Sequence, residues 1–215
     1  MITKTKKAED TCERLLNAGA EHFALHGFRQ TRVQDICQIA DANQAAVSYH
    51  FGGKYELYVS CLRHALKIAS SKYPLPSDST LPAEKRLEQL MTALCRRIFD
   101  DGDGSLFPKL IVKEMAEPTE ALETILADLI AHERDTLIGI VRDSLGPQAT
   151  DEDVMLTHLS VVALFQFYNF SRSIRQLMER KKRKLPPNVD LTINHTVSFA
   201  LAGIRSKRAE IEARA

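Results

Sequence analysis

Apolar residues recur at intervals of three and four along almost the whole chain, and no segment shows sustained alternation of apolar and polar residues. The first pattern is typical of amphipathic helices and the second of half-buried strands. The sequence therefore predicts an all-α fold of about nine helices. We expect them near residues 8–26, 31–40, 44–50, 54–72, 83–100, 106–116, 119–145, 151–179 and 189–208.

Glycine, proline and small polar residues separate these helices. Gly27 is expected to end the first helix as a C-terminal cap. Thr31 and Gln34 have the spacing of a capping box at the start of the second helix. A longer break, "YPLPSDSTLP" at Tyr73–Pro82, holds three prolines and divides a small N-terminal helical part from a larger bundle.

Between Thr31 and His50 the pattern gives a short helix, a tight polar turn and a second short helix, which is the helix-turn-helix arrangement. In that motif the second helix enters the major groove of DNA and neighbouring side chains hold phosphates. Gln44, at the start of the second helix, is suited to pair with a base edge. Phe51 is expected to anchor the motif in the core.

The stretch "RLLNAGAEHFALHGFRQTRVQDICQIADANQAAVSYHFGGKYELY" contains a G-F-x-x-T-x-V-x-D-I block and a Y-H-F-x-x-K-x-x-L close. With these motifs, residues 12–58 resemble the DNA-binding domain of the TetR family of bacterial transcriptional regulators. The family often has glycine where Asp41 stands, but aspartate tolerates the same left-handed turn. The family's DNA contacts fall on Thr31, Gln34, Gln44, Ala45, Ala46, Ser48, Tyr49, His50 and Lys54.

Three later stretches resemble the regulatory domain of the CecR-like subgroup: "LIVKEMAEPTEAL", "LFQFYNFSRSI" and "FALAGIRS". Members of that subgroup are associated with control of membrane transport and drug sensitivity. The resemblance implies a helix-turn-helix DNA-binding domain at residues 1–54. It also implies a helical regulatory domain for ligand binding and dimerisation at residues 55–215.

The predicted helix at residues 151–179 is apolar nearly all round at its centre, so it needs two packing partners. One is its own core, and the other is a second subunit or a cavity. The family resemblance implies a four-helix homodimer interface, with Leu159, Val162, Phe199 and Ile204 as candidate contacts. Candidates for a pocket that binds a small-molecule effector are Glu114, His132, Gln166, Phe167 and Phe170. Each of these five has an alternative interpretation as a surface ion, a satisfied polar group or a core residue.

Charge changes this picture little, because 29 Lys and Arg stand against 28 Asp and Glu. Affinity for nucleic acid must therefore come from a local surface. Residues 1–72 hold ten basic and seven acidic residues. The basic run "RKKRK" at Arg180–Lys184 is first of all a solvated loop, with a contact to DNA or lipid as the alternative.

The sequence contains no P-loop, dinucleotide fingerprint, H-E-x-x-H or nucleophile elbow, so we expect no enzyme, no catalytic residues and no cofactor. Cys12, Cys37, Cys61 and Cys95 lack metal-ligand spacing, so no metal is expected. The absence of a signal peptide and of an apolar run of roughly 18 residues predicts a cytoplasmic protein with no membrane partner.

These observations predict a ligand-responsive transcriptional regulator whose partners are double-stranded DNA, a small-molecule effector and a second copy of the chain. The resemblance implies a repressor that a small molecule releases from a pseudo-palindromic operator, although an activator would use the same residues. The alternative is a helical ligand-binding interaction protein that has lost specific DNA recognition. The operator sequence, the effector and the target genes do not follow from the sequence.

Overall fold

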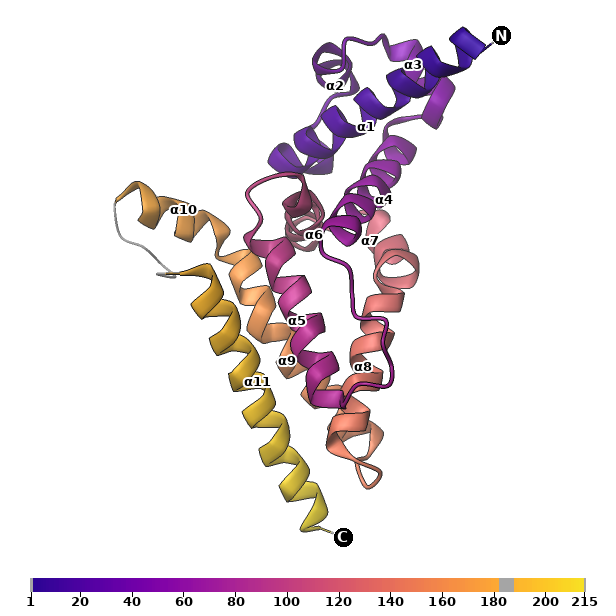
Figure 1. Ribbon diagram of the computed structural model, residues 1–215. Helices are drawn as coiled ribbons and strands as arrows, with labels where there is room; N and C mark the ends of the chain where they lie inside the picture. Colours follow the sequence, from indigo (N-terminus) through magenta and orange to yellow (C-terminus); the bar gives the residue numbers. More distant parts are fainter. Residues whose placement is uncertain (1, 182–187, 215) are drawn as a thin grey trace. The chain divides into compact units, whose positions relative to one another are not determined.

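The computed structural model describes residues 2–181 and 188–214 (Figure 1). This part of the chain is all-α and holds no strand, which confirms the predicted fold class. The helices are α1 (Ile2–Gln30), α2 (Val33–Ile39), α3 (Gln44–Phe51), α4 (Lys54–Lys72), α5 (Ala83–Phe99), α6 (Leu106–Ala116), α7 (Ala121–Thr124), α8 (Ala131–Leu145), α9 (Asp151–Phe170), α10 (Arg172–Arg180) and α11 (Val189–Glu212).

The chain folds into two compact units. The first unit holds the residues up to Lys72 together with Asp101–Leu129, and the second holds Tyr73–Asp100 and the residues from Ile130 onward. Packing therefore groups α6 and α7 with α1–α4, which differs from the predicted functional division at residue 54. The predicted division assigns DNA binding to residues 1–54 and regulation to residues 55–215, and it stays a prediction.

In the first unit, α1 packs against α4 and α6. The side chains that fill this contact include Leu15, Phe23, Leu57 and Leu110, all of them fully buried. Gly27 breaks α1 with φ 76° and ψ 169°, a conformation that L side chains rarely adopt. The helix breaks at Gly27, but the prediction that it ends there is wrong, because it resumes as far as Gln30.

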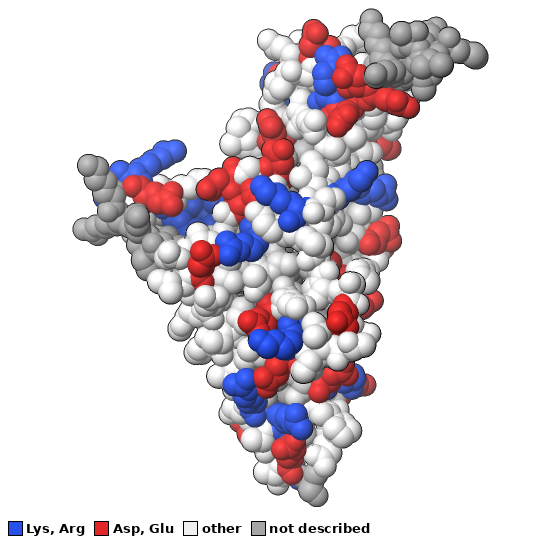
Figure 2. All heavy atoms as spheres, viewed as in Figure 1, with Lys and Arg blue, Asp and Glu red and all other residues white. Residues whose placement is uncertain are grey.

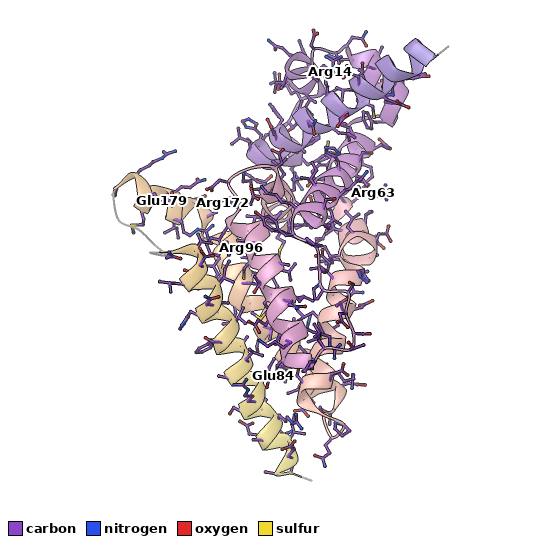
Figure 3. The ribbon with its side chains drawn as sticks, viewed as in Figure 1. Arg14, Arg63, Glu84, Arg96, Arg172 and Glu179 are labelled. Atoms are coloured by element: carbon purple, nitrogen blue, oxygen red, sulfur yellow. The ribbon has the colours of Figure 1, made fainter. Side chains whose placement is uncertain are left out.

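In the second unit, α5, α8, α9 and α11 surround one apolar core. Leu90, Leu137, Val161 and Ile193 are representative of its buried side chains. On the surface, Arg205 of α11 forms a bidentate pair with Glu84 of α5, with N–O distances of 2.8 and 2.6 Å (Figure 3). On the face drawn in Figure 2, basic and acidic side chains are interspersed along the helices, as the near-neutral composition leads one to expect.

Two of the predicted helices are each divided in the structure, so eleven α-helices replace the expected nine within the described residues. The helix expected at 119–145 is interrupted by a π-helical stretch at Ile125–Leu129. The helix expected at 151–179 bends by 43° between α9 and α10. At this bend the guanidinium of Arg175 donates to the carbonyl oxygen of Tyr168 at 2.6 Å.

Among the described residues no single helix is long and apolar enough to cross a membrane, and only α9 and α10 pass such a test as a bent pair. Most of the basic run Arg180–Lys184, and the pair Pro186 and Pro187 after it, lie outside the described residues.

Candidate nucleic-acid interface

The helix-turn-helix is formed by α2, a turn at residues 40–43, and α3. Ile36 and Cys37 of α2 and Val47 of α3 are buried, and both helices pack on α1. Asp41 in the turn has φ 47°, so it takes the left-handed conformation expected where the family often has glycine. The geometry of the motif is therefore fixed by a few apolar anchors and one special backbone position.

A side chain that the sequence did not single out holds this turn in place. Arg14 of α1 donates from Nη1 to the carbonyl oxygens of Ala40 at 2.7 Å and Asp41 at 3.2 Å (Figure 3). Its Nε also lies 3.4 Å from the Asp10 carboxylate. Hydrogen bonds from a charged donor are stronger than neutral ones, so Arg14 restrains the turn relative to α1.

Asn43 caps the N-terminal end of α3 and Gly52 its C-terminal end. The Asn43 side chain accepts a hydrogen bond from the Ala46 amide at 2.8 Å, which satisfies one of the free donors of the first turn. At the other end Gly52 has φ 90° in the left-handed region. Its amide donates to the Ser48 carbonyl at 3.1 Å. The helix therefore ends at Phe51 because glycine can adopt the conformation that follows.

The polar and small residues of α3 share one exposed face. Gln44, Ala45, Ser48 and Tyr49 follow the helical spacing i, i+1, i+4, i+5, and all four are exposed. Tyr49 is 83% exposed, which is an unusually high value for a large aromatic side chain. Below, the name "reading face" refers to these four residues.

Two of the remaining predicted contacts, Ala46 and His50, also belong to α3. Ala46 and His50 are half-buried, and the His50 ring lies 5.0 Å from the Tyr49 ring, edge to face. Gln34 is exposed near the start of α2. Phe51, expected to anchor the motif in the core, is only half-buried, and Val47 at 2% exposure takes that place.

Lys54 begins α4, as predicted, but its ammonium group is engaged within the unit. It lies 4.5 Å from the centre of the Phe28 ring and 3.5 Å from the carbonyl oxygen of Arg29. Burial lowers the pKa of Lys54 below its usual value. A phosphate bound at this point would therefore meet a lysine that is already oriented by a cation–π contact.

One prediction about Thr31 is wrong, and its predicted contact with DNA stays a prediction. The residue that precedes α2 is Arg32, with no side-chain cap, so the expected capping box with Gln34 does not form. Thr31 is 2% exposed, and its hydroxyl donates to the Gly27 carbonyl at 2.8 Å and lies 3.2 Å from Nδ1 of His22. The Thr31 hydroxyl therefore closes the Gly27 break in α1.

Burial lowers the pKa of His22, and the neighbouring His26 lowers it further. The two rings lie 4.5 Å apart. The neutral form of the His22 imidazole is therefore favoured.

The structure does not bring the predicted pocket residues together in one unit. Glu114 belongs to the first unit, where its carboxylate accepts from the Tyr58 hydroxyl at 2.9 Å and from the Thr119 amide at 2.6 Å. A buried carboxylate needs such donors, so Glu114 joins α4 to the turn after α6. Burial, and then the Glu114 charge, raises the pKa of Tyr58 far above its usual value.

The other four pocket candidates belong to the second unit. Phe167 is 65% and Phe170 48% exposed. His132 is exposed, and Gln166 is half-buried and accepts from the Asn169 side chain at 3.3 Å.

A groove of about 460 Å³ runs between α9 and α11 on the face predicted for the dimer. It is lined by Leu156, Ser160, Phe199 and Gly203, among others. Of the four predicted contacts, Leu159 and Phe199 are exposed by more than half. Val162 and Ile204 pack against the core of the unit itself.

A helix-turn-helix with an exposed second helix, followed by a helical bundle, defines the class of helix-turn-helix transcriptional regulators. The family described as bacterial regulatory proteins of the tetR family matches residues 15–61. The C-terminal domain of the HTH-type transcriptional dual regulator CecR matches residues 83–204, more than half of the chain. The chain belongs to the TetR family of regulators and carries a C-terminal domain of the CecR type. It is a DNA-binding transcriptional regulator rather than an enzyme.

Two curated relatives match the chain over different lengths. The HTH-type transcriptional dual regulator CecR of Shigella flexneri is 23% identical over 76% of this chain and 78% of its own length. The HTH-type transcriptional repressor NicS of Pseudomonas putida is 31% identical over 28% of this chain and 29% of its own length.

Two solved structures share the fold. A TetR-like transcriptional regulator from Rhodococcus sp. RHA1 superposes with a TM-score of 0.63 at 16% identity, covering 90% of this chain and 94% of its own. HlyIIR, a hemolysin II transcriptional regulator, superposes with a TM-score of 0.59 at 19% identity, covering 87% of this chain and 97% of its own.

Proposed function

We propose that this regulator is a repressor that binds a pseudo-palindromic operator as a homodimer and is released from it by a small molecule. The observation that carries the proposal is the exposed reading face of α3. The turn that precedes α3 is held in place by Arg14. Gln44 would contact a base edge, and Ala45 would allow close approach to the groove floor. Ser48 and Tyr49 would donate to phosphates, with Gln34, His50 and Lys54 at the edges of the contact.

The homodimer is supported by the groove between α9 and α11 and by the exposed Leu159 and Phe199 beside it. A two-fold dimer would present two copies of α3 to successive major grooves, about 34–36 Å apart. Operator palindromy follows from this symmetry, because each half-site meets the same reading face.

Release by a small molecule rests on the family resemblance and on the helical bundle of the second unit. An effector that prefers the wrongly spaced state by about a hundredfold supplies roughly 2.7 kcal/mol of coupling, which is enough to release an operator at modest occupancy. CecR is a dual regulator by name and NicS a repressor. A cytoplasmic location, and control of transport or drug-sensitivity genes, belong to the same proposal.

The salt dependence of DNA affinity separates this function from that of an interaction protein without DNA recognition. Fluorescence anisotropy with a short genomic duplex, measured between about 50 and 200 mM salt, should show log affinity falling steeply with log salt because phosphate contacts release counterions. Binding that is absent at the lowest salt, or insensitive to salt, would favour the interaction protein.

A further inference from the structure

Exposed apolar residues form one continuous line along α9 and α10. They are Leu156, Leu159, Ala163, Phe167 and Phe170 on α9 and Ile174 and Leu177 on α10, called the outer seam below. The six large side chains are each 48–65% exposed. The steps between members are three or four residues, and 21 positions in six steps average 3.5. A 3.5-residue repeat of apolar side chains is the signature of a helix that packs along another helix.

The bend between α9 and α10 does not interrupt the outer seam. Phe170 is the last residue of α9, and Ile174 follows it by four positions on α10. In Figure 1, α10 leads away from the other helices of the second unit, and none of its own side chains is buried. The seam thus continues from the α9 surface onto a helix that contributes nothing to the core.

The opposite face of α10 is already attached to the second unit. The Arg172 guanidinium donates to the Ile98 carbonyl (Figure 3). The Arg175 guanidinium lies 4.5 Å from the centre of the Phe99 ring and donates to Tyr168. These contacts turn the arginine face of α10 toward its own unit and leave Ile174 and Leu177 facing solvent.

This orientation decides which partner fits the seam. A helix that lies on an anionic membrane combines its apolar face with a flanking rim of basic side chains. Here Arg172 and Arg175 are bound on the other face, and the other described basic side chains, Arg180 and Lys181, lie only at the C-terminal end of α10, so no basic rim runs along Ile174 and Leu177. A partner helix requires only the 3.5-residue repeat. The outer seam also includes Leu156, which lines the groove assigned to the homodimer.

We propose that α10 is a dimerisation arm, and that Phe170, Ile174 and Leu177 pack against the outer seam of a second copy of this chain. The inference rests on the homodimer of the proposed function and extends its interface beyond α9 and α11. In a two-fold interface the same surface is used on both copies, so each arm would be covered once by its partner. The arm would then set the strength of the dimer, and through it the operator affinity.

The test compares four full-length proteins by sedimentation equilibrium: wild type, Ile174→Glu with Leu177→Glu, Leu159→Glu, and a control. The control is Leu25→Glu with Met115→Glu, which alters two apolar residues of the first unit that are more than half exposed. Circular dichroism checks that helical content is kept. Because every substitution occurs twice in the dimer, the arm variant should dimerise at least about 100-fold more weakly than wild type, while the control should not change.

Each other outcome contradicts a distinct claim. A wild-type dimer that Leu159→Glu weakens and the arm variant does not would overturn the arm and leave the α9–α11 dimer intact. A monomeric wild type would overturn the homodimer itself. If the arm variant instead loses binding to anionic phosphatidylserine vesicles and dimerises normally, the seam contacts lipid and the arm assignment is wrong.

Discussion

At the scale of single residues, we expect Arg14 to matter most for the site, because its hydrogen bonds join α1 to the turn that precedes α3. Replacing Arg14 with alanine leaves the Ala40 and Asp41 carbonyls without these donors. We expect a loss of about 1–2 kcal/mol in unfolding free energy, since a charge-assisted hydrogen bond at a partly exposed site is lost. Operator affinity should fall at least about tenfold, because the reading face is less well positioned. Denaturant unfolding and anisotropy with an operator duplex measure the two effects.

The matched control is Arg63→Ala, which removes an exposed arginine of α4 in the same unit (Figure 3). Unchanged DNA affinity in Arg14→Ala, or an equal loss in both variants, would show that the turn does not depend on Arg14.

Single residues also mark the limit of what the sequence could predict. Gly27, Asp41 and Gly52 were predictable because their backbone angles follow from local chemistry. The role of Arg14 was not, because its carbonyl partners lie 26 and 27 positions away. Thr31 was assigned to DNA by its place in the motif, but packing of α1 against α2 buries it.

At the scale of elements, the end of α3 depends on Gly52, whose φ of 90° is strained for any side chain with a Cβ. Gly52→Ala should lower the unfolding free energy by about 1–2 kcal/mol. The contrasting variant is Gly139→Ala in α8, where an added Cβ meets no atom within 4 Å. Since alanine is the better helix former, that variant should gain about 0.5–1 kcal/mol. Effects of equal sign in denaturant titrations would contradict this account of the α3 end.

The helices themselves were largely predictable, because amphipathic spacing and Gly or Pro punctuation are local signals. The break at Ser171 was not, since the apolar repeat runs across it without change of phase. The same continuity that concealed the bend makes the outer seam visible once the exposure of each residue is known. The π-helical stretch at Ile125–Leu129 likewise gives no signal in the apolar pattern.

At the scale of the whole molecule, the sequence predicted an all-α regulator, and the fold and the family matches agree. It did not predict that Asp101–Leu129 returns to pack against α1 and α4. Contacts such as that between Tyr58 and Glu114 join residues 56 positions apart, and no periodicity reports them. For the same reason the five pocket candidates were grouped without regard to the unit each belongs to.

The account depends most on one claim, that the reading face of α3 selects specific DNA. The most direct measurement is selection of genomic fragments by three purified proteins: wild type, a Gln44→Ala, Ser48→Ala, Tyr49→Ala variant, and a Gln89→Ala control. Gln89 is an exposed glutamine of α5 in the second unit. We expect the wild type and the control to recover the same pseudo-palindromic site, and the triple variant to recover none. Recovery of that site by the triple variant, or of random fragments by all three proteins, would contradict the claim.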